Sequence, residues 1–328
     1  MNFRRSIVRM GIAAACGAAA CSGTAGAAQA FPSQPVRIVG ANPAGGAADV
    51  NARRLAERLS RKWGQTVVVQ NLPGAGGSVA ASTVANATPN GHTILFAFHP
   101  MLAVNPILYS DLPFDADKDF ASAIFISKTP HVLLVNPSLP AKTVSDLIAL
   151  ARAKPGTFNF GSGGAGSSTH LAGELLKARA NVELTHVPYK GGAPAAAALM
   201  GNEIQILFDA TLTAVGHIKS GRLKGLAIAS ASRAQSIPDV PTFAESGLPG
   251  FESNIGHGLV VPAKTPKSVI AAINAAANEA IKDPEYFNSM SASGAQVMGG
   301  PPSSFSDFLV AERRKWTPIL KKLAIKAN

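Results

Sequence analysis

The sequence has little cysteine, few aromatic residues and little charge. Of 328 residues, 2 are Cys, 6% are aromatic and 15% are charged, whereas 47% are hydrophobic and 31 are Gly. So few cysteines exclude a disulfide-dense scaffold, and low charge with abundant Ala and Gly is unlike a coiled coil. A chain this long and apolar buries a sizeable core. We therefore expect a compact α/β protein of one large or two medium domains.

Residues 1–30 show the three parts of an export signal. Arg4, Arg5 and Arg9 form a basic start, residues 10–20 are apolar, and Ala28-Gln29-Ala30 matches the A-x-A pattern that precedes cleavage. No acidic residue interrupts the segment. We expect cleavage after Ala30, by the general or the twin-arginine route, and a periplasmic mature protein.

Both cysteines, Cys16 and Cys21, lie inside this signal. The mature chain would hold no thiol, which excludes cysteine catalysis, thiolate metal sites and disulfides from it. A lipid anchor on Cys21 is the alternative, although residues 18–20 lack the larger aliphatic residue usual there. No other apolar run reaches ~18 residues, so we expect no membrane span.

The charge balance is basic. Without the three leader arginines, 27 basic residues stand against 19 acidic ones, a surplus of eight that favours anionic partners. The basic residues are dispersed on helix-like stretches without interleaved aromatics, a pattern of solvated helix faces. We therefore expect no nucleic-acid partner.

Apolar runs, glycine turns and helix-like stretches alternate twice along the mature chain. The first set predicts strands at 36–40, 66–70 and 93–98 with helices at 49–63 and 79–87. A second set runs from residue 131 to about 229, after the acidic, proline-bearing stretch 111–120. This spacing predicts βαβ units and mostly parallel sheets with flanking helices. Two such sets indicate two sheets and hence two domains.

The tail returns to the first domain. A strand at 259–261 and helices at 266–282 and 304–325 are expected to pack onto the first sheet. Domain 1 then comprises residues 31–129 plus 255–328, and domain 2 comprises residues 130–254. Two crossings of this kind form a hinge with a ligand cleft between the domains.

Catalytic motifs are scarce. The seven histidines show no metal-ligand spacing, and there is no phosphate-binding loop or G-x-S-x-G elbow. Gly161, Gly163 and Gly166 match the dinucleotide-binding pattern G-x-G-x-x-G, but the preceding strand is short and polar. The acidic residue that would bind the ribose, Glu183, lies at the start of its strand, whereas this contact needs a residue at the strand's end. We expect no cofactor, no metal and no enzymatic activity.

Three glycine turns share one position, after a strand and before a helix: residues 43–46, 74–78 and 161–169. Their free N–H groups and the positive ends of helix dipoles can bind an anion without a cationic side chain. The hydroxyls of Ser162, Ser168 and Thr169 would add donors. Because these turns lie at the carboxyl ends of strands, we expect them to meet at the cleft.

Three titratable residues stand close to these turns. Asp49 opens the first helix and either caps it or touches a ligand. Asp209 ends a strand, where ligands of α/β proteins lie. His170 faces a ligand or makes a buried structural hydrogen bond.

From residue 31 to the end, the chain carries ordered motifs: FPSQPVRIV at 31–39, VVVQNLPGAGG at 67–77, PNGHT at 89–93, HVPYKG at 186–191 and PDVPT at 238–242. In these it resembles the Bug-type receptors, the extracytoplasmic solute-binding proteins of tripartite tricarboxylate transporters. The resemblance implies an α/β fold of the periplasmic binding-protein class, type II-like, whose two domains are joined by two hinge crossings and close over small carboxylates.

The resemblance also implies a site. One ligand carboxylate lies against residues 43–46, partly through ordered waters, and a second group meets residues 162–169. The position of Asp209 often helps to read the distal or amino end of the ligand. Family members usually carry an aromatic residue at the position of Asn42 and Trp at that of Gly256, so a more polar or roomier cleft is expected here.

The expected function is a periplasmic, monomeric receptor that captures a mono- or dicarboxylate, or an amino acid, for the membrane subunits of such a transporter. The alternatives are an exported serine hydrolase or transferase that uses Ser162 or Ser168 with His170, and a sensor that docks on a signalling protein. The expected ligand-binding residues are Asn42, Pro43, Ala44, Gly45, Gly46, Asp49, Gly77, Ser78, His99, Ser162, Gly163, Gly166, Ser168, Thr169, His170 and Asp209.

Overall fold

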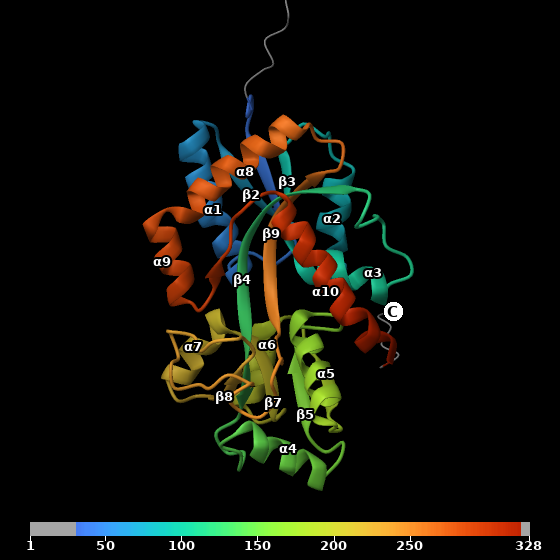
Figure 1. Ribbon diagram of the computed structural model, residues 1–328, viewed down its shortest axis with the longest axis vertical. Coiled ribbons are helices and arrows are strands. Elements are labelled where there is room, and N and C mark those ends of the chain that lie inside the picture. The colour runs from blue at the N-terminus through green and yellow to red at the C-terminus, as the bar shows by residue number, and fades with distance from the viewer. Residues whose placement is uncertain (1–30, 323–328) are drawn as a thin grey trace, which may run out of the picture. The chain divides into compact units, whose positions relative to one another are not determined.

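Two long antiparallel strands, β4 (Phe120–Val135) and β9 (Asn254–Pro262), run side by side through the middle of the computed structural model (Figure 1). The structure describes residues 31–322. The expected signal peptide with its two cysteines and cleavage site, and the end of the last expected helix, lie outside the described residues.

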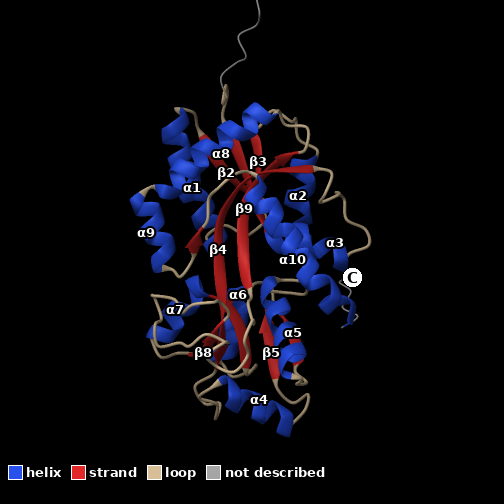
Figure 2. Ribbon diagram, in the orientation of Figure 1, coloured by secondary structure: helices blue, strands red, loops and turns tan. Residues whose placement is uncertain are grey.

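Strands and helices alternate over most of the remaining chain (Figure 2). The other strands are β1 (Val36–Gly40), β2 (Val67–Asn71), β3 (Thr93–Phe98), β5 (Asn159–Ser162), β6 (Thr185–Pro188), β7 (Ile206–Ala210), β8 (Lys224–Ile228) and β10 (Gln296–Val297). The helices are α1 (Ala47–Trp63), α2 (Ser78–Ala85), α3 (Asn105–Leu108), α4 (Val144–Ala153), α5 (Ser168–Ala180), α6 (Gly192–Met200), α7 (Thr211–Lys219), α8 (Lys267–Lys282), α9 (Pro284–Ala292) and α10 (Ser303–Lys322), with a 3₁₀-helix η1 (Ala75–Gly77) and a π-helix η2 (Pro100–Val104).

The strands form one hydrogen-bonded order, β2-β1-β3-β9-β4-β7-β5-β6, with β8 and β10 also on β4. Within it, β1 lies parallel to β2 and β3, and β5 lies parallel to β6 and β7. Strand β4 pairs with β9 as far as Pro130↔Asn254 and with β7 from His131↔Ala210. The sheet is therefore continuous where we expected two separate sheets, because β4, at 16 residues, is long enough to belong to both halves.

We call β1, β2, β3, β9 and the part of β4 before His131 the first half of the sheet. Its side chains alternate between two faces, as the period of two of a strand requires. Ile38, Ile94 and Leu259 pack with α1, α8 and α9, whereas Leu95 and Val260 pack with α2 and the start of α10. Helices thus cover both faces, as in an α/β sheet. The expectation of mostly parallel pairing was wrong, because β9 pairs antiparallel with both β3 and β4, and β4 also runs antiparallel to β7 and β8.

The second half of the sheet, β5 to β8 with the end of β4, is covered in the same way. Leu133 and Phe208 pack with α4 and α5, and Leu134 and Leu207 pack with α6 and α7. Helix α10 reaches both cores, because Phe305 belongs to a core of the first half, whereas Trp316 and Leu320 belong to the core that also contains Leu133 and the buried side chains of α5. The expectation that the last helix packs only onto the first sheet was wrong for its second part.

Residues 120–130 of β4 were not expected to be a strand. They carry Ser122, Ser127, Lys128 and Pro130, which interrupt the apolar run that predicts a buried strand. The chain crosses from the first half to the second along β4 and returns along β9. The described residues form one compact unit, and the division into two domains at residues 130 and 254 stays a prediction.

Candidate functional site

The first turn, residues 43–46, follows β1 and leads into α1. Its four residues are exposed, and α1 begins with Gly46 as N-cap and no side-chain cap. The first N–H groups of a helix have no acceptor within it, and they attract anions together with the helix dipole. This turn therefore presents uncapped amides to solvent.

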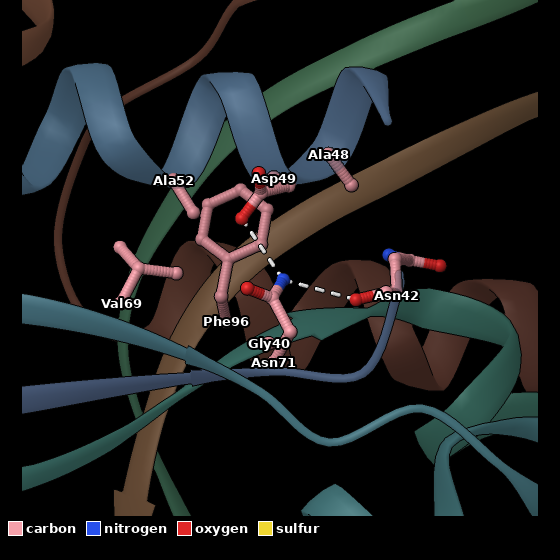
Figure 3. A pocket seen from close by; sticks show the side chains of 8 residues that line it. All are labelled: Gly40, Asn42, Ala48, Asp49, Ala52, Val69, Asn71 and Phe96. Carbon is pink, nitrogen blue, oxygen red and sulfur yellow. Dashed lines mark hydrogen bonds between the residues drawn. The ribbon is translucent and has the colours of Figure 1, made fainter. Parts of the chain in front are cut away.

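Asp49 shapes the first turn from inside. Its Oδ2 accepts the N–H of Gly45 at 2.8 Å and Nε of Arg53 at 2.9 Å, and its Oδ1 accepts Nδ2 of Asn71 at 2.9 Å. Asn71 also donates to the carbonyl of Asn42 at 3.0 Å, so one amide links the turn to the carboxylate (Figure 3). Both carboxylate oxygens are thus bonded within the protein.

The carboxylate of Asp49 stays charged. Burial by itself would raise its pKa, but hydrogen bonds from Arg53, Gly45 and Asn71 outweigh burial and hold the pKa below its ordinary value of 3.8. The small hollow around it, shown in Figure 3, has no room for a water molecule. Of the two expected roles, capping and ligand contact, these contacts favour a structural one.

The second turn, residues 163–167, lies between β5 and α5. Three of its N–H groups donate to side chains: Gly163 to Thr169 Oγ1 (3.0 Å), Gly164 to Ser162 Oγ (3.1 Å) and Gly166 to His170 Nδ1 (3.1 Å). Among the hydrogen bonds of residues 31–322, none engages the N–H of Ala165, Ser168 or Thr169. These three amides, one in the second turn and two at the start of α5, are the candidate donors for a ligand.

The hydroxyls expected to face a ligand are occupied. Ser162 is fully buried, and its Oγ lies 2.6 Å from Nε2 of His186. Oγ of Ser168 lies 3.1 Å from Nε2 of His131. These side chains hold the second turn in shape, so main-chain amides are the better candidates for ligand contact.

His170 and His186 stack with ring centroids 3.9 Å apart. Burial, with smaller contributions from nearby positive charge such as that of Lys177, lowers the pKa of His170 to about 3 and that of His186 to about 4. Both rings are therefore neutral near pH 7. A neutral His170 can accept the N–H of Gly166 at Nδ1, which fits the structural alternative for this residue.

The third turn, residues 74–77, leads into α2. Its four residues all have positive φ, and at Gly77, with φ of 94°, an added Cβ would lie 2.7 Å from Sδ of Met101. Only glycine fits there. Asn105 donates to the carbonyl of Gly76 at 3.0 Å. Gly77, the last residue of this turn, and Ser78, the first residue of α2, are both in the expected ligand set and are both buried.

A hollow of about 430 Å³ lies beside the third turn. It is lined by Ala75, Ser78, Val79, Ser82, Thr83, Tyr109, Asp111, Leu112 and Pro113. Its residues come from the first half of the molecule alone. The hollow therefore does not join the first and second turns.

Asp209 is the penultimate residue of β7 and lies between the starts of α6 and α7. Its carboxylate accepts the N–H of Ala210 at 2.9 Å and the hydroxyl of Thr213 at 2.7 Å. A Cβ on Gly192, the first residue of α6, would lie 3.5 Å from its Oδ1. Burial raises the pKa of Asp209 to about 6, although these hydrogen bonds oppose the rise.

His99 holds β9 rather than a solute. It is 1% exposed, its Nδ1 accepts the N–H of Gly256 at 3.0 Å, and its Nε2 lies 3.4 Å from Glu312. Burial keeps the pKa of His99 well below its ordinary value. At Gly256, an added Cβ would lie 2.3 Å from Phe308, so the space of the expected Trp is filled by α10.

The hydrolase alternative finds no support in the serine contacts. Ser162 and Ser168 meet His186 and His131 instead of the expected His170, and both serines are buried. His170 approaches a carboxylate, Glu174, only at 3.7 Å. Among the contacts of residues 31–322, neither the His131 nor the His186 imidazole has a carboxylate partner, and both hydroxyls are shielded from solvent. Within residues 31–322, no group of three or more His, Cys, Asp or Glu side chains is placed to hold a metal.

Sequence reasoning missed His131, His186 and Asn71. Their partners lie 37, 24 and 22 residues away along the chain, and no spacing rule connects them. Asn105, which bonds to the third turn, could have been found from the sequence in one respect. Asn followed by Pro is typical of a helix start, and α3 does begin at Asn105.

A family model described as the tripartite tricarboxylate transporter family receptor matches residues 51–325. Among curated relatives, a protein from the tcbD-tcbE intergenic region of Pseudomonas sp. (strain P51) is 37% identical and covers 91% of this chain and 89% of its own. Protein BugT of Bordetella pertussis is 32% identical and covers 99% of both chains.

Solved structures agree. The R. palustris protein Rpa4515 with adipate superposes with a TM-score of 0.83 at 32% identity, over 89% of this chain and 97% of that one. MatC of Rhodopseudomonas palustris with bound malate has a TM-score of 0.81 at 30% identity, over 88% of this chain and 100% of that one. The periplasmic binding protein BugD has a TM-score of 0.82 at 30% identity, over 91% of this chain and 100% of that one.

These likenesses confirm the expected fold, that of the periplasmic binding proteins, a class whose members bind solutes. In residues 31–322, no helix has the length and apolarity needed to cross a bilayer. The match covers most of the chain, and the relatives align over nearly their whole length. The chain therefore belongs to the receptor family of the tripartite tricarboxylate transporters.

Proposed function

We propose that this protein is a periplasmic receptor that captures a small dicarboxylate and presents it to the membrane subunits of a tripartite transporter, without covalent chemistry. Its relatives Rpa4515 and MatC were solved with adipate and malate. Both are dicarboxylates. The proposal includes cleavage of residues 1–30 after export and a monomeric state.

One observation carries the proposal. The first turn exposes the uncapped start of the 17-residue helix α1. The carboxylate next to this turn, that of Asp49, points inward and accepts hydrogen bonds from three groups of the protein. An anion at this turn meets amide donors and no competing acidic side chain. A turn of this kind suits a carboxylate without help from Lys or Arg.

The other end of the ligand belongs to the second half of the molecule. The unengaged amides of Ala165, Ser168 and Thr169 are donors for a second carboxylate at the start of α5. Asp209 is the proposed reader of a distal hydroxyl or amino group, because its protonated form can donate and its charged form can accept.

Thermal denaturation with organic acids tests the proposal. The purified mature protein is heated with malate, adipate and other small mono- and dicarboxylates at millimolar concentration. Binding stabilises by RT ln(1 + [L]/Kd), so a micromolar ligand gives roughly 4 kcal/mol. Stabilisation by a dicarboxylate is expected, and no response to any carboxylate or amino acid contradicts the proposal.

Gly46→Val locates the site. Gly46 has an ordinary φ of −76°, and an added Cβ meets only the carbonyl of Pro43 at 3.5 Å, so the fold tolerates a side chain. The valine would cover the uncapped amides and weaken binding of the best carboxylate by tenfold or more, measured by calorimetry. Gly216→Val, at an exposed position in α7 with open space, is the control and should bind normally. Equal affinity in the two variants would remove the first turn from the site.

A further inference from the structure

One buried imidazole links three segments that lie far apart in the sequence. His131 is fully buried, and its Nδ1 lies 2.9 Å from Oγ of Ser253 while its Nε2 lies 3.1 Å from Oγ of Ser168. Ser253 immediately precedes β9, and Ser168 is the first residue of α5. The ring therefore joins both crossing strands to the helix start of the second turn.

The position of His131 in the sheet is the crossing point itself. Pairing of β4 with β9 ends at Pro130↔Asn254, and pairing with β7 begins at His131. The main chain closes the same junction, because His131 N–H donates to the carbonyl of Ser253 at 3.0 Å and Ser253 N–H donates to that of Ala229 at 3.1 Å. This junction lies where the chain passes between the two halves of the sheet.

The chemistry of the ring suits a link. Burial lowers the pKa of His131 to about 3, with smaller contributions from the charges of His99 and Lys315. A neutral imidazole has one donor and one acceptor nitrogen, and a serine hydroxyl can take either role, so both ring nitrogens are satisfied in either tautomer. Loss of one serine frees one nitrogen and weakens the hold on the other.

We propose that His131 is a positioning residue that relays the state of the hinge, through Ser168, to the start of α5. Its effect on affinity rests on the proposed function, because Ser168 and Thr169 supply amides to the second carboxylate site. The relay itself is a property of the protein without ligand. It predicts that Ser253, which is bonded to β4 and not to α5, controls the stability of the first turn of α5.

Hydrogen exchange on the ligand-free mature protein tests the relay. The reporters are the amides of His170 and Leu171, which donate to Ser167 Oγ (3.2 Å) and to the Ser167 carbonyl (3.0 Å). Ser253→Ala should make them exchange about fivefold faster, the size expected for loss of one hydrogen bond. Amides of α4, which has its own capping box at Thr143 and Asp146, should not change.

A double-mutant cycle separates a relay from general destabilisation. In a Ser168→Ala background, which already lacks the bond to Nε2, Ser253→Ala should add nothing at these amides. Ser127→Ala is the matched control, because Ser127 is a fully buried serine of β4 whose Oγ has no partner in the described part of the chain. It should leave α5 unchanged. Unaltered exchange in Ser253→Ala, or an equal added effect in the Ser168→Ala background, overturns the relay.

Calorimetry with malate and adipate adds the functional readout. For whichever acid binds the wild type, Ser253→Ala should weaken binding about fivefold and Ser127→Ala should not. Full affinity in Ser253→Ala together with fast exchange at α5 would overturn the effect on the site. If the wild type binds neither acid, the proposed ligand class loses its support, while the exchange cycle still decides the relay.

Discussion

The first turn is held by a charged carboxylate, whereas the second turn is held by neutral side chains. In the first turn Asp49 alone collects three donors. In the second turn a serine, a threonine and a histidine each accept one N–H. Both arrangements leave helix-start amides for a solute. Two similar helix-start turns thus depend on one strong interaction or on several weak ones, and the two arrangements should fail differently.

The largest effect is expected from Asp49→Ala. It removes the acceptor of Gly45 and leaves Asn71 with one partner fewer, at a cost of about 3 kcal/mol in the free energy of unfolding. The half-exposed Arg53 contributes little to this loss. Urea denaturation measures it. Asp49→Asn, which keeps one acceptor oxygen, should lose about half as much, and equal stability of both variants with the wild type would show that the carboxylate does not hold the turn.

How far the sequence predicts this site differs between the two turns. The first turn was expected with its strand, its helix and Asp49, because all of them lie within about 30 residues and obey local rules of helix starts. The same rules cannot show that Asp49 points inward, since this depends on Asn71 in the next strand. For the second turn the glycines were predicted, but His131 and His186 come from strands brought close only by folding.

For the fold, too, features set by local sequence were predicted and features set by distant residues were not. Strands β1 and β3 were predicted with their observed bounds, because a strong apolar pattern marks each of them. The first part of β4 and the partition of α10 between two cores were not predicted. Both are set by long-range packing, which a period within one element does not reveal.

The next largest effect is expected on the pH dependence of stability, through His170. The pKa of His170 is about 3 in the folded protein against 6.5 when unfolded, so below pH 6.5 the unfolded state binds more protons and stability falls as the pH is lowered. At pH 5 the protonation of His170 in the unfolded state lowers the free energy of unfolding by an amount on the order of 2 kcal/mol. Urea denaturation across pH 4.5 to 7 should show a shallower slope in His170→Phe than in the wild type.

Asp49 supplies the contrast in the same experiment. Its folded pKa is lowered, so its contribution is complete above its unfolded pKa and is lost only as the pH falls through the folded value, below 3.8. Asp49→Asn should therefore run parallel to the wild type from pH 4.5 to 7, offset by a constant amount. If its slope changed and that of His170→Phe did not, the assignment of charged and neutral anchors would be reversed.

The smallest effect is expected from Thr169→Val, which decides whether the second turn binds through hydroxyls or amides. The hydroxyl of Thr169 accepts the N–H of Gly163 and lies 3.1 Å from that of Ser167, so its loss should cost about 1 kcal/mol of stability. If amides bind the ligand, the affinity for the best dicarboxylate, measured by calorimetry, should fall less than fivefold, and Thr169→Ser should restore stability. A loss of a hundredfold in Thr169→Val, with full recovery in Thr169→Ser, would instead place the hydroxyl on the ligand, because a charge-assisted bond to a carboxylate is about twice as strong as a neutral one.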